Sequence, residues 1–149
     1  MLDTANPVRK GEEIDSNAVT EYLISQGIAL QGQPEVTQFS GGASNWTYRL
    51  KYANRDLILR RPPKGTKAKS AHDMVREYKV QKALQSQYPR VPNMVALCTD
   101  DHVIGCDFYV MDRIEGIIPR ANLPKALTLS EQQVSELCRQ VVDALIDLH

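Results

Sequence analysis

A glycine-rich turn followed by a cation is the feature of this sequence best suited to chemistry. The turn lies in FSGGASNWTYRLKYANRDLILRR, residues 39–61, and contains Ser40, Gly41 and Gly42. Adjacent glycines permit positive φ and let a backbone approach a ligand closely. Such a turn, entering a hairpin with a cation on the returning strand, can hold a polyphosphate, because backbone N–H groups face the anion and the cation reaches it from below. The alternative is an ordinary β-turn in which Asn45 caps its own backbone.

Strands on both sides must position this turn. Residues 33–39 predict a short strand that enters it. Residues 46–52 alternate between an apolar, aromatic face and a polar face. The first face consists of Trp46, Tyr48, Leu50 and Tyr52, and the second of Thr47, Arg49 and Lys51. This period of two predicts a strand. Residues 53–56 make the return, and Leu57 to Arg60 predict the second strand of the hairpin.

A helix is expected before the hairpin. Residues 1–14 are polar and without periodicity at their start, and we interpret them as a flexible leader. Asp15 can cap a helix that runs to about Gln26, with Gly27 at its C′ position. We interpret this helix as a packing element without chemistry.

A second helix is expected from Ala71 to about Gln85, capped by Ser70. Its buried stripe is predicted to contain Val75, Tyr78, Ala83 and Leu84. Glu77 lies one position from Tyr78 and can therefore point along the edge of the buried face.

The remaining sequence predicts further strands and a last helix. Strands are expected at 94–99 and 108–114, with a turn at 100–101 and a strand fragment at 103–104; short connections imply antiparallel pairing. Ser130 and Gln133 form a capping box, and the helix that follows carries an apolar stripe. The stripe consists of Val134, Leu137, Val141, Leu145 and Leu148. Because no later sequence covers it, we expect a longer parent protein and self-association of this chain through the stripe.

Bulk properties exclude several classes of protein. The 149 residues fit one domain, and 18 basic residues balance 18 acidic ones, so no net charge favours nucleic acid or an anionic membrane. The basic loop at 60–70 has no aromatic residue to stack bases, and a nucleic-acid binder would show affinity that falls steeply with salt. No signal peptide or membrane span is predicted, and three cysteines without metal spacing favour a reducing cytoplasm.

Four fragments in order resemble the N-terminal lobe of the protein-kinase-like superfamily, most closely its aminoglycoside phosphotransferase and choline kinase branch. SGGASNWTYRL corresponds to the phosphate loop, LILRRPPKG to the third strand, AHDMVREYKVQKAL to helix C and DFYVMDRIEG to the strand into the hinge. The combination LRRPP…AH…REY is especially similar to kinase-like domains fused to acyl-CoA dehydrogenases. The resemblance covers roughly residues 36–149. It implies an α+β fold: an antiparallel sheet of about five strands with helix C, an N-terminal helix and the first helix of a truncated second lobe. The lobe would span 15–114, and 115–149 would be hinge and first second-lobe helix.

The resemblance also assigns roles to residues. Arg60 would contact the α- and β-phosphates, Ile58 on the same strand face would pack on the adenine, and Glu77 would pair with Arg60. Kinases generally have lysine at the position of Arg60, and the arginine fork can still bridge phosphate and carboxylate. The alternative is an exposed Arg60–Glu77 surface pair that adds little stability.

The resemblance implies further nucleotide contacts. Ser40, Gly41, Gly42, Ser44 and Asn45 would cover the phosphates through backbone N–H groups and short polar side chains. Met111 would be the gatekeeper, while Asp112 C=O and Ile114 N–H would bond the adenine. Without the resemblance, residues 108–114 would be read simply as a core strand.

The family's later His-Gly-Asp…Asn catalytic loop and magnesium-binding aspartate do not occur in these residues. The expected parent is therefore an ATP- or GTP-dependent kinase that phosphorylates a hydroxyl of a small metabolite, with Mg²⁺ ligands outside this chain. No catalytic residue is assigned, and the fragment is expected to be inactive. The alternative is a non-catalytic nucleotide-binding or protein-interaction module. Sugar-, choline-, homoserine-, hydroxyacyl- and aminoglycoside-type acceptors all stay open.

Overall fold

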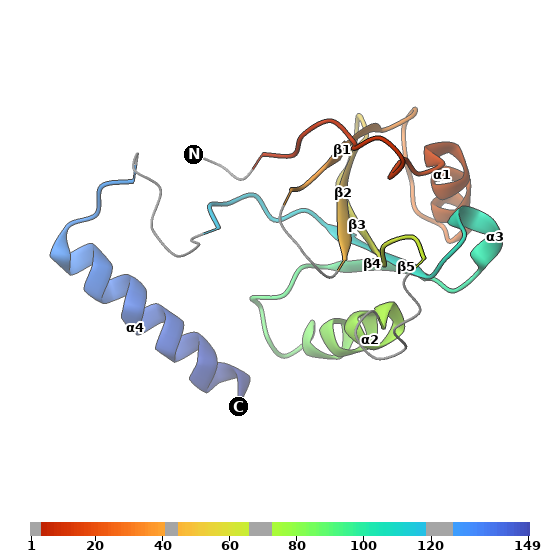
Figure 1. The fold of residues 1–149 in the computed structure, drawn as a ribbon. Helices are drawn as coiled ribbons and strands as arrows, with labels where there is room; N and C mark the ends of the chain where they lie inside the picture. The colour runs from red at the N-terminus through yellow and green to blue at the C-terminus, as the bar shows by residue number, and fades with distance from the viewer. Residues whose placement is uncertain (1–3, 41–44, 66–72, 119–126) are drawn as a thin grey trace.

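A five-stranded antiparallel sheet organises the computed structural model, which describes residues 4–40, 45–65, 73–118 and 127–149 (Figure 1). The strand order is β1-β2-β3-β5-β4. The strands are β1 (Glu35–Gln38), β2 (Trp46–Lys51), β3 (Asp56–Arg61), β4 (Met94–Cys98) and β5 (Phe108–Asp112). The expected α+β class and the five antiparallel strands are confirmed.

Alternation along the strands gives the sheet two different faces. The larger core cluster contains Tyr48 and Leu50 of β2, in the alternation that the sequence predicts. Helix α1 (Ser16–Ser25) covers this face with Val19 and Leu23, both fully buried. The cluster also contains Tyr52, Leu57, Leu59, Ala96, Cys98, Phe108 and Val110. Asp15 caps α1 as expected, since its side chain accepts a hydrogen bond from Ala18 N.

The opposite face carries a smaller core and the polar residues of interest. Met74 of helix α2 (Met74–Leu84) packs there with Met94 and Tyr109. Ile58 lies opposite Met111 in the ladder between β3 and β5. Arg60 lies opposite Tyr109 in the same ladder. This second face is where α2 meets the sheet.

Helix α2 begins later than its sequence predicts. It starts at Met74, and Asp73 is its N-cap, with a side-chain oxygen 2.8 Å from Arg76 N. The expected cap, Ser70, and the expected first residue, Ala71, lie outside the described residues. One member of the predicted stripe, Ala83, is exposed, and Met74, which the prediction did not include, is buried.

The strand fragment expected at residues 103–104 is wrong, because these residues belong to the short helix α3 (Asp101–Ile104). Asp100 caps this helix, accepting a hydrogen bond from His102 N. Gly105 ends it in the left-handed region at φ 80°, which glycine adopts without strain.

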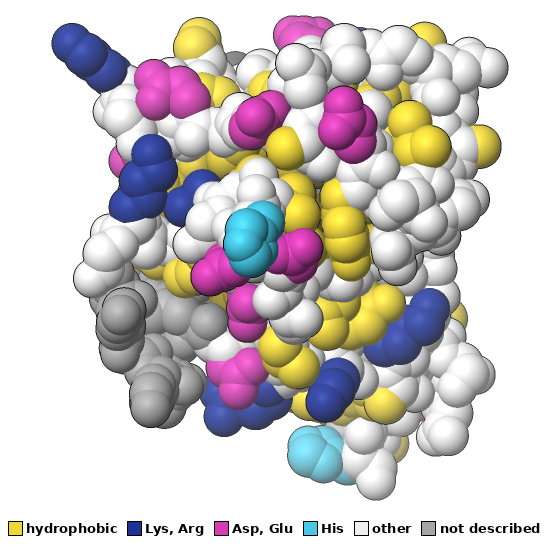
Figure 2. All heavy atoms as spheres, turned by 90° about the vertical axis from the view of Figure 1, so that its right-hand side faces the viewer, with side chains coloured by type: hydrophobic (Ala, Val, Ile, Leu, Met, Phe, Trp, Pro, Cys, Tyr) yellow, Lys and Arg dark blue, Asp and Glu magenta, His cyan; other side chains and the backbone are white. Residues whose placement is uncertain are grey.

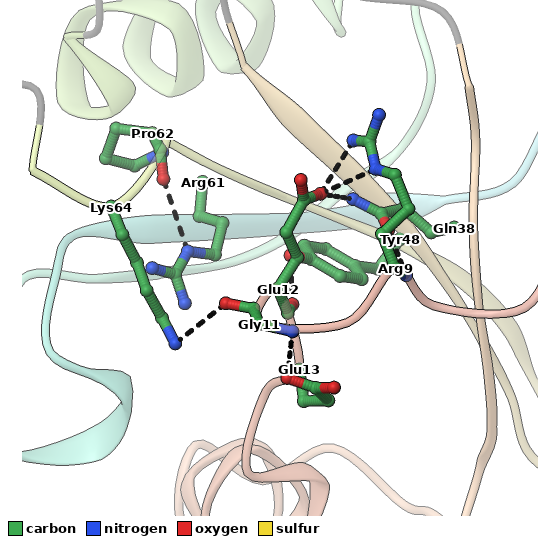
Figure 3. Close-up of polar contacts among 9 residues, drawn as sticks. All are labelled: Arg9, Gly11, Glu12, Glu13, Gln38, Tyr48, Arg61, Pro62 and Lys64. Atoms are coloured by element: carbon green, nitrogen blue, oxygen red, sulfur yellow. Dashed lines mark hydrogen bonds and ion pairs between the residues drawn. The ribbon is translucent and has the colours of Figure 1, made fainter.

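The expected leader is bound to the sheet along its described part, residues 4–14 (Figure 3). Asn6 pairs with Gln38 at the end of β1 through two backbone hydrogen bonds of 2.8 and 2.7 Å. The carboxylate of Glu12 accepts a hydrogen bond from the Gln38 side chain, and the Glu12 carbonyl accepts one from the Tyr48 hydroxyl. The segment therefore lies next to the strand that leads into the glycine turn.

Helix α4 (Glu131–Leu148) lies away from the sheet (Figure 1). The predicted capping box of Ser130 and Gln133 is present. Every member of the predicted apolar stripe is exposed, from 40% for Leu137 to 55% for Val141 and Leu145. A hydrogen bond from Tyr88 OH to Ala144 O joins α4 to the segment after α2. Among the described residues, no helix combines the length and apolarity that crossing a bilayer requires.

Candidate functional site

The predicted ion pair between strand and helix is present. Arg60 Nη2 of β3 lies 3.7 Å from Glu77 Oε2 of α2, on the face of the sheet that α2 covers. The two side chains are 32% and 29% exposed. The pair is therefore partly exposed, lying where β3 faces α2.

The guanidinium of Arg60 has a buried donor without a partner. Its Nε is the one buried side-chain nitrogen or oxygen without a hydrogen-bond partner in the described part of the chain. Leaving such a donor unpaired costs on the order of 1–3 kcal/mol, and more for a charged group. An anionic oxygen brought to this position would relieve that cost.

Glu77 is held by uncharged donors rather than by Arg60 alone. Asn45 Nδ2 donates to Oε1 at 3.0 Å, and Tyr109 OH donates to Oε2 at 2.9 Å. Asn45 is buried, at 4% exposure, so its amide faces the helix. The side-chain contact to phosphate expected of Asn45 stays a prediction, because here that amide binds Glu77.

A cavity of about 440 Å³ lies beside this cluster. Four of the predicted nucleotide contacts line it: Ile58, Met111, Asp112 and Ile114. The other lining residues are Phe39, Thr47, Pro92, Arg113, Gly116, Ile117 and Ile118. Thr47 lies directly opposite Arg60 in the ladder between β2 and β3, so cavity and guanidinium are neighbours on one face. A mostly apolar wall with a cation at one end suits a flat ring that carries an anionic group.

The far wall of the cavity is the chain that leaves β5. The strand ends at Asp112, two residues before the expected end, and Ile114 is 66% exposed. The Asp112 carboxylate accepts hydrogen bonds from Arg55 at 2.7 Å and Asn93 at 2.9 Å. These bonds hold the backbone at the point where the predicted adenine contacts begin.

The glycine turn is only partly described. Ser40 is exposed at its entrance, and Phe39 N donates to Thr47 O at 2.9 Å, which closes the base of the hairpin. Gly41, Gly42 and Ser44 lie outside the described residues, so their expected phosphate contacts stay predictions.

Sequence reasoning missed several contributors to the site, among them Tyr109 and Phe39. Tyr109 shares its strand face with Met111 by the period of two, so the alternation could have found it. Phe39 belongs to the cavity wall through the fold of the hairpin, and no local signal indicates that.

The cluster does not fit a Mg²⁺ ion among the described residues. Both oxygens of Glu77 accept hydrogen bonds, and a hard cation needs several oxygen ligands. The candidate ligand group in the described chain is Asp100, Asp101 and His102 on the side of α3, where acidic side chains surround a histidine (Figure 2). Those groups are exposed, and Asp100 is occupied in capping α3. The hydrogen bond from the backbone N–H of His102, followed by the contact with its imidazole, holds the pKa of the Asp100 carboxyl below its usual range.

Comparisons with known proteins identify a family and a fold. The sequence model described as "Phosphotransferase enzyme family" matches residues 35–149. Acyl-CoA dehydrogenase family member 10 of Mus musculus is 42% identical over 118 residues, which are 78% of this chain and 11% of that protein. Acyl-CoA dehydrogenase family member 11 of Homo sapiens is 34% identical over 141 residues, 92% of this chain and 18% of that protein. The chain thus spans less than a fifth of these two relatives.

One solved structure has a similar fold. It is a Ralstonia eutropha protein described as a "putative aminoglycoside phosphotransferase", with a TM-score of 0.58 and 28% sequence identity. The match covers 79% of this chain and 32% of that one.

Proposed function

The chain belongs to the phosphotransferase enzyme family and has its kinase-like fold, and from this premise we propose that it supplies a nucleotide-binding half-site to a small-molecule kinase. The nucleotide is ATP or GTP, and the phosphate acceptor is a hydroxyl of a small metabolite. The proteins to which the chain is similar are much longer, so activity belongs to a larger protein in this proposal.

The observation that carries the proposal is the unpartnered Nε of Arg60 beside an apolar cavity. A buried, charged donor without an acceptor favours an anionic ligand, and the nearby cavity favours a flat apolar ring. A nucleotide combines both chemistries in one molecule. Arg60 would bond the phosphates and Ile58 would pack against the base, while Met111 and the backbone at Asp112 and Ile114 would border it.

Catalysis needs groups that these residues do not contain. Phosphoryl transfer requires a residue that orients the hydroxyl and a site for Mg²⁺. Among the described residues near Arg60, Glu77 is the one carboxylate of the cluster, and both of its oxygens already accept hydrogen bonds. We therefore propose that the metal and the acceptor are bound outside this chain, and that the chain alone does not turn over.

Calorimetric titration of the chain with ATP and with adenosine tests the binding proposal. ATP is expected to bind more tightly, because only ATP can use the guanidinium. Arg60→Ala should weaken ATP binding roughly ten- to hundredfold, because the loss of a charge-assisted hydrogen bond has an effect of that size. The affinity for adenosine should stay unchanged. Arg60→Lys should fall between the two, since it keeps the charge and loses the planar fork.

Ile58→Ala should weaken ATP and adenosine alike, because both present the same base to the cavity. Arg90→Ala changes an exposed arginine between α2 and β4 and is the matched control for charge. Equal affinity of the Arg60→Ala variant and the unchanged chain for ATP would overturn the proposal.

The second candidate, a non-catalytic interaction module, is favoured by the exposed stripe of α4. A second experiment incubates the chain with ATP, Mg²⁺ and hydroxylated metabolites and measures phosphate transfer. Catalytic phosphate transfer would contradict the proposed division of labour. Absence of ATP binding, together with concentration-dependent association, would favour the interaction module.

A further inference from the structure

The carboxylate of Glu77 is the meeting point of three separate segments. Asn45, which follows the glycine turn, donates to one oxygen at 3.0 Å. Tyr109 of β5 donates to the other oxygen at 2.9 Å. Arg60 of β3 reaches the same side only to 3.7 Å. The helix glutamate is thus held by two uncharged side chains and only loosely by the cation.

Both uncharged donors are buried where water cannot replace them. Tyr109 is fully buried and Asn45 is 4% exposed. Gln81 Nε2 donates to the Tyr109 hydroxyl at 3.3 Å, so the proton of that hydroxyl is directed to Glu77. Burial raises the pKa of Tyr109 to about 12, so the hydroxyl stays a donor at neutral pH.

This arrangement leaves the guanidinium available. In a two-point ion pair one carboxylate occupies two of the five N–H donors of an arginine. Here Arg60 makes a single long contact with Glu77, and its Nε has no partner in the described residues. The neutral donors keep Glu77 close enough to orient Arg60 without taking all of its hydrogens.

We propose that Asn45 and Tyr109 are positioning residues for nucleotide binding: they hold Glu77 so that Arg60 presents its free donors to the phosphates. The inference rests on the proposed function. It also assigns a second role to Asn45, which couples the base of the glycine turn to α2. A change at Asn45 or Tyr109 should therefore weaken the contact of Arg60 with the phosphates and leave binding of the base unchanged.

The test is a double-mutant cycle measured by titration with ATP and with adenosine. Tyr109→Phe removes one hydroxyl and keeps the ring. It should weaken ATP binding roughly three- to tenfold and leave adenosine binding unchanged. In an Arg60→Ala background the same change should have no further effect on ATP binding, because the residue it positions is gone.

Tyr78→Phe is the matched control. The ring of Tyr78 packs against Tyr109, with centroids 6.4 Å apart, and in the described part of the chain its hydroxyl makes no bond to Glu77. This control should leave both affinities unchanged. If Tyr109→Phe fails to fold, Asn45→Ala takes its place in the cycle with the same expected pattern.

The outcomes separate the two proposals. If Arg60→Ala leaves ATP binding unchanged, or if the chain binds no ATP, the proposed function fails and this inference fails with it. If Arg60→Ala weakens ATP binding while Tyr109→Phe or Asn45→Ala is additive with it, the function stands and the positioning role is refuted. Equal losses for ATP and adenosine would likewise refute it, since they would indicate a general structural effect.

Discussion

Arg49 and Asp56 form a two-point ion pair that joins β2 to the start of β3. The Nε–Oδ1 and Nη2–Oδ2 distances are 2.8 and 2.6 Å. Arg113, which lines the cavity, adds a third contact of 3.2 Å to the same carboxylate. The backbone N–H of Arg113 also donates to Asp56 O at 3.0 Å. One carboxylate therefore fixes the hairpin against the wall of the candidate nucleotide site.

Asp56→Asn should make the free energy of unfolding less dependent on pH in the acid range. The hydrogen bond from Arg49 lowers the pKa of Asp56 below its ordinary value of 3.8. The stabilisation is therefore present above that ordinary value and is lost as pH falls through the lower folded pKa. The variant should lose up to about 1 kcal/mol at neutral pH, because water screens a half-exposed pair, and little at acid pH.

Urea unfolding at several pH values measures this difference. Asp147→Asn is the matched control, since Asp147 is exposed on α4 and forms no ion pair among the described residues. Parallel pH profiles for Asp56→Asn and the unchanged chain would contradict the prediction.

Gln38→Ala should release the N-terminal segment. The buried amide accepts a hydrogen bond from Arg9 N at 3.0 Å and donates one to the Glu12 carboxylate. Arg9 N would lose its acceptor, and within the described part of the chain the Glu12 carboxylate would keep only its contacts with the Arg9 side chain, so we expect a loss of about 1 kcal/mol in the free energy of unfolding. Hydrogen exchange should show faster exchange at Asn6. Gln33→Ala, an exposed glutamine near the same strand, should change neither quantity.

Thr20→Val should destabilise the chain more than Tyr52→Phe. Thr20 Oγ1 donates to Ser16 O at 2.7 Å, so in its 2.8 Å contact with Tyr52 OH the tyrosine is the donor. Valine would leave the buried tyrosine hydroxyl without an acceptor, at about 1–3 kcal/mol, whereas phenylalanine removes that donor at about 1 kcal/mol. Chemical denaturation of both variants checks the order, and the reverse order would show that the donor assignment is wrong.

Leu145→Lys should reduce self-association of the chain. The stripe on α4 is exposed over its whole length, and burying one leucine of it against a second copy would favour association roughly tenfold or more. Sedimentation velocity over a range of concentrations measures the effect. Gln132→Lys adds the same charge on α4 outside the stripe and is the control. A chain that stays monomeric at high concentration would contradict the expectation.

The pairing of Arg60 with Glu77 shows which features of the site could be predicted from the sequence. Period-two alternation placed Ile58 and Arg60 on one face of a strand, and the register confirms their neighbours. The pair itself depended on the family resemblance, because Arg60 and Glu77 lie on different elements and no local signal brings them together. The helix that carries Glu77 was predicted, although its cap was not.

Local interactions explain most of the remaining differences between the predicted and the observed elements. A strand fragment was expected at Val103 and Ile104 because β-branched residues favour strands. The Asp100 cap and the left-handed Gly105 made the segment a helical turn instead. The two methionines that pack with Tyr109, Met74 and Met94, became core residues through the approach of α2 to the sheet.

By itself, the sequence determined the five strands and the caps of α1 and α4, because strand periodicity and caps act between residues a few positions apart. Only the tertiary structure decided which donors surround Glu77, which donor of Arg60 stays unpaired and which walls enclose the cavity. Those properties arise where β3, β5, α2 and the residue after the glycine turn converge. They depend on contacts of 2.9–3.7 Å between segments that are distant in the sequence, and no pattern along the chain encodes such contacts.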